Sequence, residues 1–153
     1  MAVIPAKPIP IDNLVSQLRR DEGLRCQAYC DPLGKWTIGV GHELYGVAPE
    51  VACKMRWTEW QSYNQLQADI KQATELVSQF HWYSNLDPIR QAVIQNMAFQ
   101  LENKLLEFHD LIACCERKDY NGAATAMLDS AWAKQVPKRA QRLATQMRSG
   151  TWQ

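Results

Sequence analysis

Residues 21–42 read DEGLRCQAYCDPLGKWTIGVGH, and this stretch decides the fold expected for the N-terminal part of the chain. Gly23 predicts the end of a preceding helix, because glycine readily adopts the left-handed conformation that follows a last helical turn. The tetrapeptide Asp31-Pro32-Leu33-Gly34 is typical of a tight turn between two strands. We therefore expect a helix followed by a small antiparallel sheet, with strands near residues 28–29, 35–40 and 43–45.

Three side chains in this stretch could act together on a substrate. Glu22 lies in the last helical turn, where the helix dipole and partial burial should raise the pKa of its carboxyl, as a general acid requires. Asp31 lies in the turn and Thr37 in the second strand. Two carboxyls and a hydroxyl suit the hydrolysis of a glycosidic bond, in which one acid protonates the leaving oxygen and the other assists water. Taken singly, each of the three also has an ordinary interpretation as a surface charge or a strand residue.

The rest of the chain is predicted to be mostly helical. Asp12 can cap the first helix, and Thr58 with Gln61 has the spacing of a capping box at the start of a long helix that runs to about residue 80. Asp87 followed by Pro88 predicts the start of a central buried helix. Further helical segments are expected at residues 49–55, 105–115 and 120–128, and from Pro137 to a stop at Gly150.

Length and composition favour one soluble globular domain. The chain has 153 residues, of which 46% are hydrophobic and 22% charged, and it holds no apolar run of the roughly 18 residues that span a bilayer. Residues 1–11 contain three prolines and lack the apolar centre of a secretory signal, so an extended arm is expected there. The net charge of +1 predicts no nucleic-acid partner. A basic stretch from Ser130 to Gln153 could face an anionic surface or simply be a solvated helix face.

Cysteine usage points to a reducing compartment. The five cysteines are an odd number without a secretory signal, so free thiols in a cytosol are expected. Cys26 and Cys30 have only loosely metal-like spacing, and His42 alone is a poor additional ligand. The sequence therefore predicts neither a metal nor a cofactor.

The spacing Glu22, eight residues, Asp31, five residues, Thr37 resembles the active-site signature of the phage-type lysozymes, the endolysins of glycoside hydrolase family 24. The neighbouring segments 21–25 and 37–42 are similar to the family as well. Further similarity lies in segments 96–100, 132–140 and 150–152, so the resemblance covers nearly everything after about residue 12. Residues 43–56 depart from it, because this connection is shorter than in the best-known members, and the near-neutral charge and the prolyl arm also differ.

The resemblance implies an α+β, lysozyme-like fold of two lobes within a single domain of residues 1–153. A lobe of about residues 12–57, with the first helix and the small antiparallel sheet, would be joined by a connecting helix at about 58–80 to a larger all-helical lobe at about 81–153. It also implies roles for the three residues of the signature. Glu22 would be the general acid, Asp31 would assist water or stabilise the positive charge, and Thr37 would hold the attacking water. Inversion at the anomeric carbon would require the two carboxyls to be roughly 6.5–9.5 Å apart.

Supporting residues follow from the same resemblance. Arg139 matches an arginine that pairs with the catalytic glutamate, and Gln100 matches a glutamine near the substrate; a surface ion pair and a core amide are the alternatives. His42 matches a histidine that forms a structural ion pair with an acid on the long helix, here Asp69. Trp36 is the tryptophan best placed to stack on a sugar, since strand alternation turns it away from Thr37.

The function implied is hydrolysis of the β-1,4 bond between N-acetylmuramic acid and N-acetylglucosamine in bacterial peptidoglycan, by a monomer without metal or cofactor. Without a signal or membrane anchor, the protein would accumulate in the host cytoplasm and need a separate pore-forming protein to reach the wall at lysis. Two alternatives stay open. One is a non-catalytic wall-binding or virion-associated relative, and the other is a chitinase-like enzyme on the same scaffold.

Overall fold

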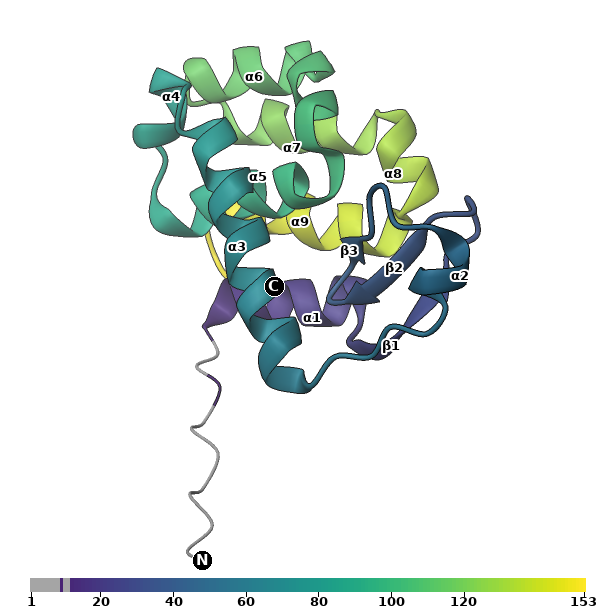
Figure 1. The fold of residues 1–153 in the computed structure, drawn as a ribbon. Helices are drawn as coiled ribbons and strands as arrows, with labels where there is room; N and C mark the ends of the chain where they lie inside the picture. The colour runs from purple at the N-terminus through teal and green to yellow at the C-terminus, as the bar shows by residue number, and fades with distance from the viewer. Residues whose placement is uncertain (1–8, 10–11) are drawn as a thin grey trace, which may run out of the picture. The chain divides into compact units, whose positions relative to one another are not determined.

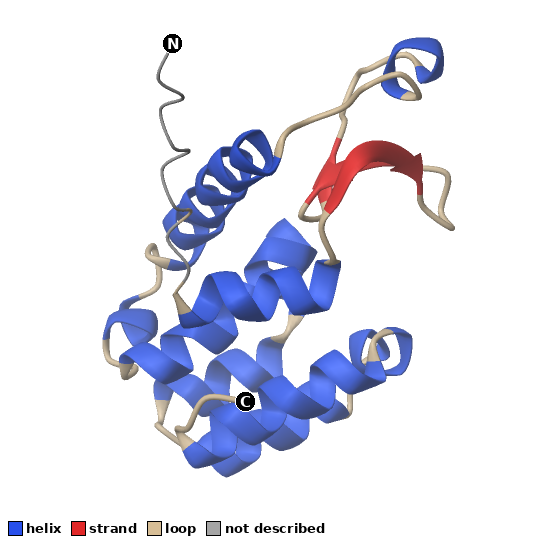
Figure 2. Cartoon of the chain, turned by 90° about the horizontal axis from the view of Figure 1, so that it is seen from below, coloured by secondary structure: helices blue, strands red, loops and turns tan. Residues whose placement is uncertain are grey.

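The computed structural model describes residue 9 and residues 12–153. The predicted extended arm at residues 1–11 therefore lies, apart from Ile9, outside the described residues. Figure 1 shows the helices and strands in their order along the chain, which divides after Ala68 into two compact units. All strands of the described chain lie in the first unit, and the second unit is helical (Figure 2). This confirms the predicted α+β class.

The first unit begins with helix α1, Asn13–Glu22, in the position predicted from its caps. The Asp12 carboxylate accepts a hydrogen bond from the Val15 amide at 2.8 Å, and Gly23 ends the helix with a φ of 76°. Val15 and Leu18 turn into the core of this unit. Glu22 is thus the last residue of a capped helix, and the start of the sheet follows it directly.

The sheet has three antiparallel strands in the order β1-β2-β3. Their bounds are β1 Arg25–Cys30, β2 Trp36–Gly39 and β3 His42–Glu43. Tyr29 lies opposite Thr37, and Thr37 lies opposite Glu43, so these three side chains share one face of the sheet. The first strand is longer than predicted, since its exposed polar residues carry little hydrophobic signal.

The connection to the long helix is short. Helix α2 covers Pro49–Ala52, and a bridge between Gln27 and Arg56 ties the following segment back to β1. The predicted capping box opens helix α3, Glu59–Val77: the Thr58 amide donates to Gln61 Oε1 at 2.8 Å, and the Gln61 amide donates to Thr58 Oγ1 at 3.1 Å. The helix ends before residue 80, and Trp60 in its first turn is 39% exposed.

Beyond α3, the second unit consists of helices around one apolar core. They are α4 His81–Ser84, α5 Pro88–Leu101, the 3-10 helix η1 Glu102–Glu107, α6 His109–Glu116, α7 Tyr120–Leu128, α8 Ala131–Gln135 and α9 Pro137–Ser149. Buried residues occur all around α5, which makes it the central helix as predicted; they are Ala92, Val93, Ile94, Asn96, Met97 and Ala98. Gly150 ends α9 in the left-handed conformation, also as predicted.

The single helix predicted over residues 105–115 is wrong. Residues 102–107 form the 3-10 helix η1, and α6 begins only at His109. Phe108, with a non-helical ψ of 64°, separates the two, while Leu105 and Leu111 on either side are both buried in the core. Burial of both leucines therefore does not require the continuous helix that their spacing suggested.

Candidate active site

Glu22 lies against the turn between β2 and β3. A Cβ atom placed on Gly41 would lie 2.7 Å from Glu22 Oε2 and 2.9 Å from its Cδ, well inside van der Waals contact. Gly41 has a φ of 64°, which is a conformation that glycine adopts at little cost. The absence of a side chain at Gly41 therefore leaves the space that the half-buried Glu22 carboxyl occupies. Glu22 is therefore the residue that approaches Gly41.

Asp31 is oriented by its own turn. Its Oδ1 accepts hydrogen bonds from the amides of Leu33 at 2.9 Å and Lys35 at 2.8 Å. The turn is closed by the Gly34 amide, which donates to the Asp31 carbonyl at 3.0 Å, and the Asp31 amide donates to the Lys35 carbonyl at 2.8 Å. Both side-chain hydrogen bonds go to Oδ1. One carboxylate oxygen thus fixes the side chain, and Oδ2 can accept a hydrogen bond from water.

Thr37 lies on β2 and only 7% of its surface is exposed. Its hydroxyl donates to the Lys35 carbonyl at 3.2 Å, which leaves the oxygen lone pairs as acceptors for a water. Lys35 in turn forms an ion pair with Glu43 at 3.6 Å. Trp36 is half-buried opposite Cys30, and the alternation of side chains along β2 turns it to the face away from Thr37, as predicted.

Tyr29 is a residue that sequence reasoning missed. It lies opposite Thr37, and the guanidinium of Arg25 is 4.4 Å from the centre of its ring. Burial raises the pKa of the Tyr29 phenol, the charges of Glu22 and Asp31 raise it further, and Arg25 opposes them. The negative charges of Glu22 and Asp31 therefore both affect the Tyr29 hydroxyl. The available signal was its position in β1, two residues before Asp31.

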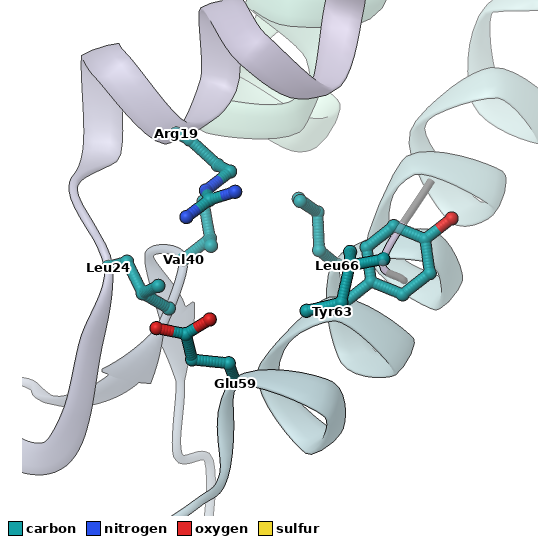
Figure 3. Close-up of a pocket in the computed structure, with 7 residues that line it drawn as sticks. Arg19, Leu24, Val40, Glu59, Tyr63 and Leu66 are labelled. Carbon is teal, nitrogen blue, oxygen red and sulfur yellow. The ribbon is translucent and has the colours of Figure 1, made fainter. Parts of the chain in front are cut away.

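A separate small pocket lies in the same unit between α1 and α3 (Figure 3). Its lining is mostly apolar and consists of Ile9, Arg19, Leu24, Val40, Glu59, Tyr63 and Leu66. Glu22, Asp31 and Thr37 do not line it. We therefore do not assign the reaction to this pocket.

In the second unit, Arg139 is held by Asn96. Only 5% of Arg139 is exposed; its Nε and Nη2 donate to Asn96 Oδ1 at 2.9 and 2.8 Å, and Nη2 donates to the Asn96 carbonyl at 3.3 Å. Asn96 is itself fully buried in α5. A guanidinium fixed in this way keeps a defined position on α9. Its predicted pairing with Glu22 joins residues of different units and stays a prediction.

Gln100 and Trp132 form a second polar contact in this unit. The Trp132 indole Nε1 donates to Gln100 Oε1 at 2.8 Å, and Trp132 is buried while Gln100 is exposed. This hydrogen bond orients the side-chain oxygen of Gln100, and the Gln100 amide nitrogen remains available as a donor. The predicted contact of Gln100 with substrate also stays a prediction.

His42 and Asp69 fall in different units as well, and their predicted ion pair is untested. The His42 ring lies 5.6 Å from the Trp57 ring, centre to centre.

The part of the chain that the structure describes contains no cluster of three His, Cys, Asp or Glu residues suited to a metal ion. Within that same part, no helix is both long and apolar enough to cross a bilayer.

The helical fold with its small three-stranded antiparallel sheet is that of the lysozyme-like class of proteins. A model of the phage lysozyme family matches residues 19–148. The chain therefore belongs to the phage lysozyme family. This membership supports a lysozyme-like, glycoside hydrolase function.

Individual relatives agree with the family. The chain is 27% identical to probable T4-type lysozyme 1 of Dictyostelium discoideum, over 92% of this chain and 96% of that protein. It is 24% identical to probable T4-type lysozyme 2 of the same organism, over the same shares. It is also 27% identical to the pre-baseplate central spike protein Gp5 of Enterobacteria phage T4, over 94% of this chain but only 29% of that much longer protein.

Proposed function

We propose that the protein is a muramidase that hydrolyses the β-1,4 bond between N-acetylmuramic acid and N-acetylglucosamine in peptidoglycan. Glu22 acts as the general acid that protonates the leaving oxygen. Asp31 accepts a proton from the attacking water through Oδ2, and the Thr37 oxygen holds that water. The reaction inverts the anomeric carbon.

The observation that carries this proposal is the common environment of the two acids. Glu22 ends α1 and lies against Gly41 in the turn between β2 and β3, and Asp31 lies in the turn between β1 and β2, so both acids adjoin the same small sheet. Asp31 keeps one carboxylate oxygen for water, and Thr37 lies on the same sheet face as Tyr29. These contacts support a site in the first unit in which the three residues meet one substrate. In the second unit, Arg139 and Gln100 are supporting residues with fixed head groups, and Trp36 on β2 is a further sugar-stacking candidate.

The variant Glu22→Gln tests the assignment of the acid. Gln keeps the size of the side chain and cannot supply the proton, so the rate at which reducing ends appear on purified peptidoglycan should fall by about 100-fold or more. Glu50→Gln is the matched control, since Glu50 is an exposed acid of the same unit, on α2. Full activity in Glu22→Gln would reject this role for Glu22.

The biological setting is part of the proposal. We infer an endolysin that accumulates as a monomer in the host cytoplasm and reaches the wall at lysis through a membrane lesion made by a separate pore-forming protein. Expression in a bacterium with and without a pore-forming protein tests this. Lysis should require both, and lysis by this protein alone would contradict the need for a partner.

A virion-associated role is the second candidate, and the similarity to the T4 central spike protein favours it. Mass spectrometry of purified virions separates the two roles, because an endolysin is absent from the particle and a structural lysozyme is present in fixed number. Release of sugars from chitin rather than peptidoglycan would instead favour the chitinase-like alternative.

A further inference from the structure

The main chain of Lys35 connects the two side chains that the proposed mechanism assigns to the attacking water. The Lys35 amide donates to Asp31 Oδ1 at 2.8 Å, and the Lys35 carbonyl accepts from the Thr37 hydroxyl at 3.2 Å. The same carbonyl accepts from the Asp31 amide at 2.8 Å. A displacement of Lys35 would therefore move the Asp31 carboxylate relative to the Thr37 oxygen.

The side chain of Lys35 ties this connection to β3. Thr37 lies opposite Glu43, and beyond this pair the Leu44 amide donates to the Trp36 carbonyl at 2.8 Å. Lys35 is the next residue along the chain, and its ammonium forms an ion pair with Glu43 at 3.6 Å. The ion pair therefore extends the contact between β2 and β3 by one residue, into the turn that holds Asp31.

The exposure of this ion pair indicates a local effect. The Lys35 side chain is 50% exposed and that of Glu43 is 26% exposed. An ion pair so close to solvent contributes little to the stability of a whole unit. Turns open far more readily than the core does, so a weak contact can still change how often a turn opens. The Lys35–Glu43 pair should therefore act on the order of the turn rather than on global unfolding.

We propose that Lys35 is a positioning residue for the hydrolytic water, and that its ion pair with Glu43 keeps the Asp31 carboxylate and the Thr37 oxygen in a fixed relation. This inference rests on the proposed function, in which Asp31 accepts a proton from that water and Thr37 holds it. Lys35 and Glu43 exchange no proton in the reaction. A looser turn lets the two acceptors drift apart, which lowers kcat and leaves the binding of the glycan almost unchanged.

Charge variants of the pair test the proposal. Lys35→Met removes the ammonium and keeps the main chain and most of the side-chain length. Lys35→Glu sets two carboxylates against each other, and the exchange variant, Lys35→Glu with Glu43→Lys, restores an ion pair of reversed polarity. Arg117→Met is the matched control, because Arg117 forms an exposed ion pair with Asp119 in the second unit, also at 3.6 Å.

The first measurement is hydrogen exchange of the amides of residues 33 and 35 by NMR, which does not depend on turnover. Both amides donate to Asp31 Oδ1, so their exchange reports how firmly the turn holds that carboxylate. Exchange should be about threefold to fivefold faster in Lys35→Met, and about tenfold faster in Lys35→Glu. The exchange variant should return to within about twofold of the wild type, and Arg117→Met should leave both amides unchanged.

The second measurement is the separation of kcat from KM on purified peptidoglycan. The variants should lose kcat in the same order as their amides lose protection, with KM within about twofold of the wild type. The exchange variant should recover kcat, and Arg117→Met should not change it. Unfolding by urea should be nearly the same in all of them, which distinguishes positioning from a general loss of stability.

The two proposals fail in different ways. Unchanged amide exchange in Lys35→Glu, or faster exchange with an unchanged kcat, would overturn the positioning role and leave the muramidase assignment intact. An exchange variant that does not recover kcat would also overturn it, because the ion pair would then not be what matters. Faster amide exchange in the variants of a protein whose wild type releases no reducing ends would support the hold on the turn and reject the proposed function.

Discussion

Gly41 and Gly46 share a backbone conformation and differ in their surroundings. Both have positive φ angles, of 64° and 69°. A Cβ on Gly41 would meet the Glu22 carboxyl, whereas a Cβ on Gly46 would have no other atom within 4 Å. The pair therefore separates the cost of backbone strain from the effect of displacing Glu22.

Gly41→Ala should lower both stability and activity, and Gly46→Ala only stability. Each alanine adopts a left-handed conformation at a cost of roughly 1–2 kcal/mol. In Gly41→Ala the methyl group also pushes Glu22 away, and a displacement of the acid should reduce kcat by about 100-fold. Denaturant unfolding and initial rates on peptidoglycan measure the two effects. Equal rates in the two variants would show that Glu22 does not depend on the space at Gly41.

The catalytic candidates were predictable from sequence because their signature lies within one short stretch. The spacing of Glu22, Asp31 and Thr37 is a property of the chain alone. The identity of the residue that approaches Gly41 could not be predicted from the sequence, because Glu22 belongs to another element. The contact depends on how the sheet folds back toward α1. Tyr29 gave no signal of its own, because a tyrosine in a strand is ordinary.

Asp31 has a structural role in the turn after β1, and the proposed mechanism gives it a chemical role as well. Asn can accept the same two amide hydrogen bonds through its carbonyl oxygen, whereas Ala cannot. Both Asp31→Asn and Asp31→Ala should lose most activity, but only Asp31→Ala should lose stability, by about 1 kcal/mol. Thermal unfolding beside rate measurements tests this. Retained activity in Asp31→Asn would mean that the negative charge is not required.

Helix α5 offers a pH-dependent test of its predicted cap. Burial alone would raise the pKa of Asp87, but the Arg90 amide and guanidinium, at 3.0 and 2.9 Å from its oxygens, outweigh burial and lower it. A lowered folded-state pKa contributes stability above the unfolded pKa of Asp and loses it as the pH falls through the folded value. Asp87→Ala should therefore cost about 1 kcal/mol at pH 7.

That cost should shrink as the pH falls below the usual range of aspartate. Unfolding by urea at several pH values measures it, and Asp87→Asn, which keeps the cap without the charge, is the control. A cost in Asp87→Ala that stays constant down to pH 2 would contradict the link to the charge of Asp87.

Elements with explicit end signals were predicted well. The caps at Asp12, Asp87 and Gly150 and the Thr58–Gln61 box are local hydrogen-bonding devices, so the sequence contains them in full. Residues 102–116 have no such device at Phe108, and their apolar spacing fits one helix as well as two. Packing of the second unit decided between these possibilities, and packing is not readable from a local window.

At the scale of the whole molecule, each unit has its own buried residues, and the cysteines distinguish core from surface. Cys26, Cys30 and Cys53 are exposed, and Cys114 and Cys115 are buried; all are unpaired. Burial, together with neighbouring Cys114, raises the pKa of the Cys115 thiol to about 12. The thiol of Cys115 is therefore protonated and shielded at neutral pH, which is the state least reactive toward alkylation.

Iodoacetamide at pH 8 should label three cysteines in the folded protein and all five in urea. Peptide mass spectrometry identifies the sites, and activity before and after reduction should be equal because no disulfide is present. Rapid native labelling of Cys115 would show that the core of the second unit opens readily.

The proposed inversion is a property of the whole enzyme, because it requires Glu22 and Asp31 to act from opposite sides of the sugar with a water between them. The most direct measurement is ¹H NMR of purified peptidoglycan fragments in the first minutes of hydrolysis, before mutarotation. The account predicts that the new N-acetylmuramic acid reducing ends appear first as the α-anomer, and that Glu22→Gln produces none. Initial release of the β-anomer would contradict it, because that product requires a covalent intermediate and a closer pair of carboxyls.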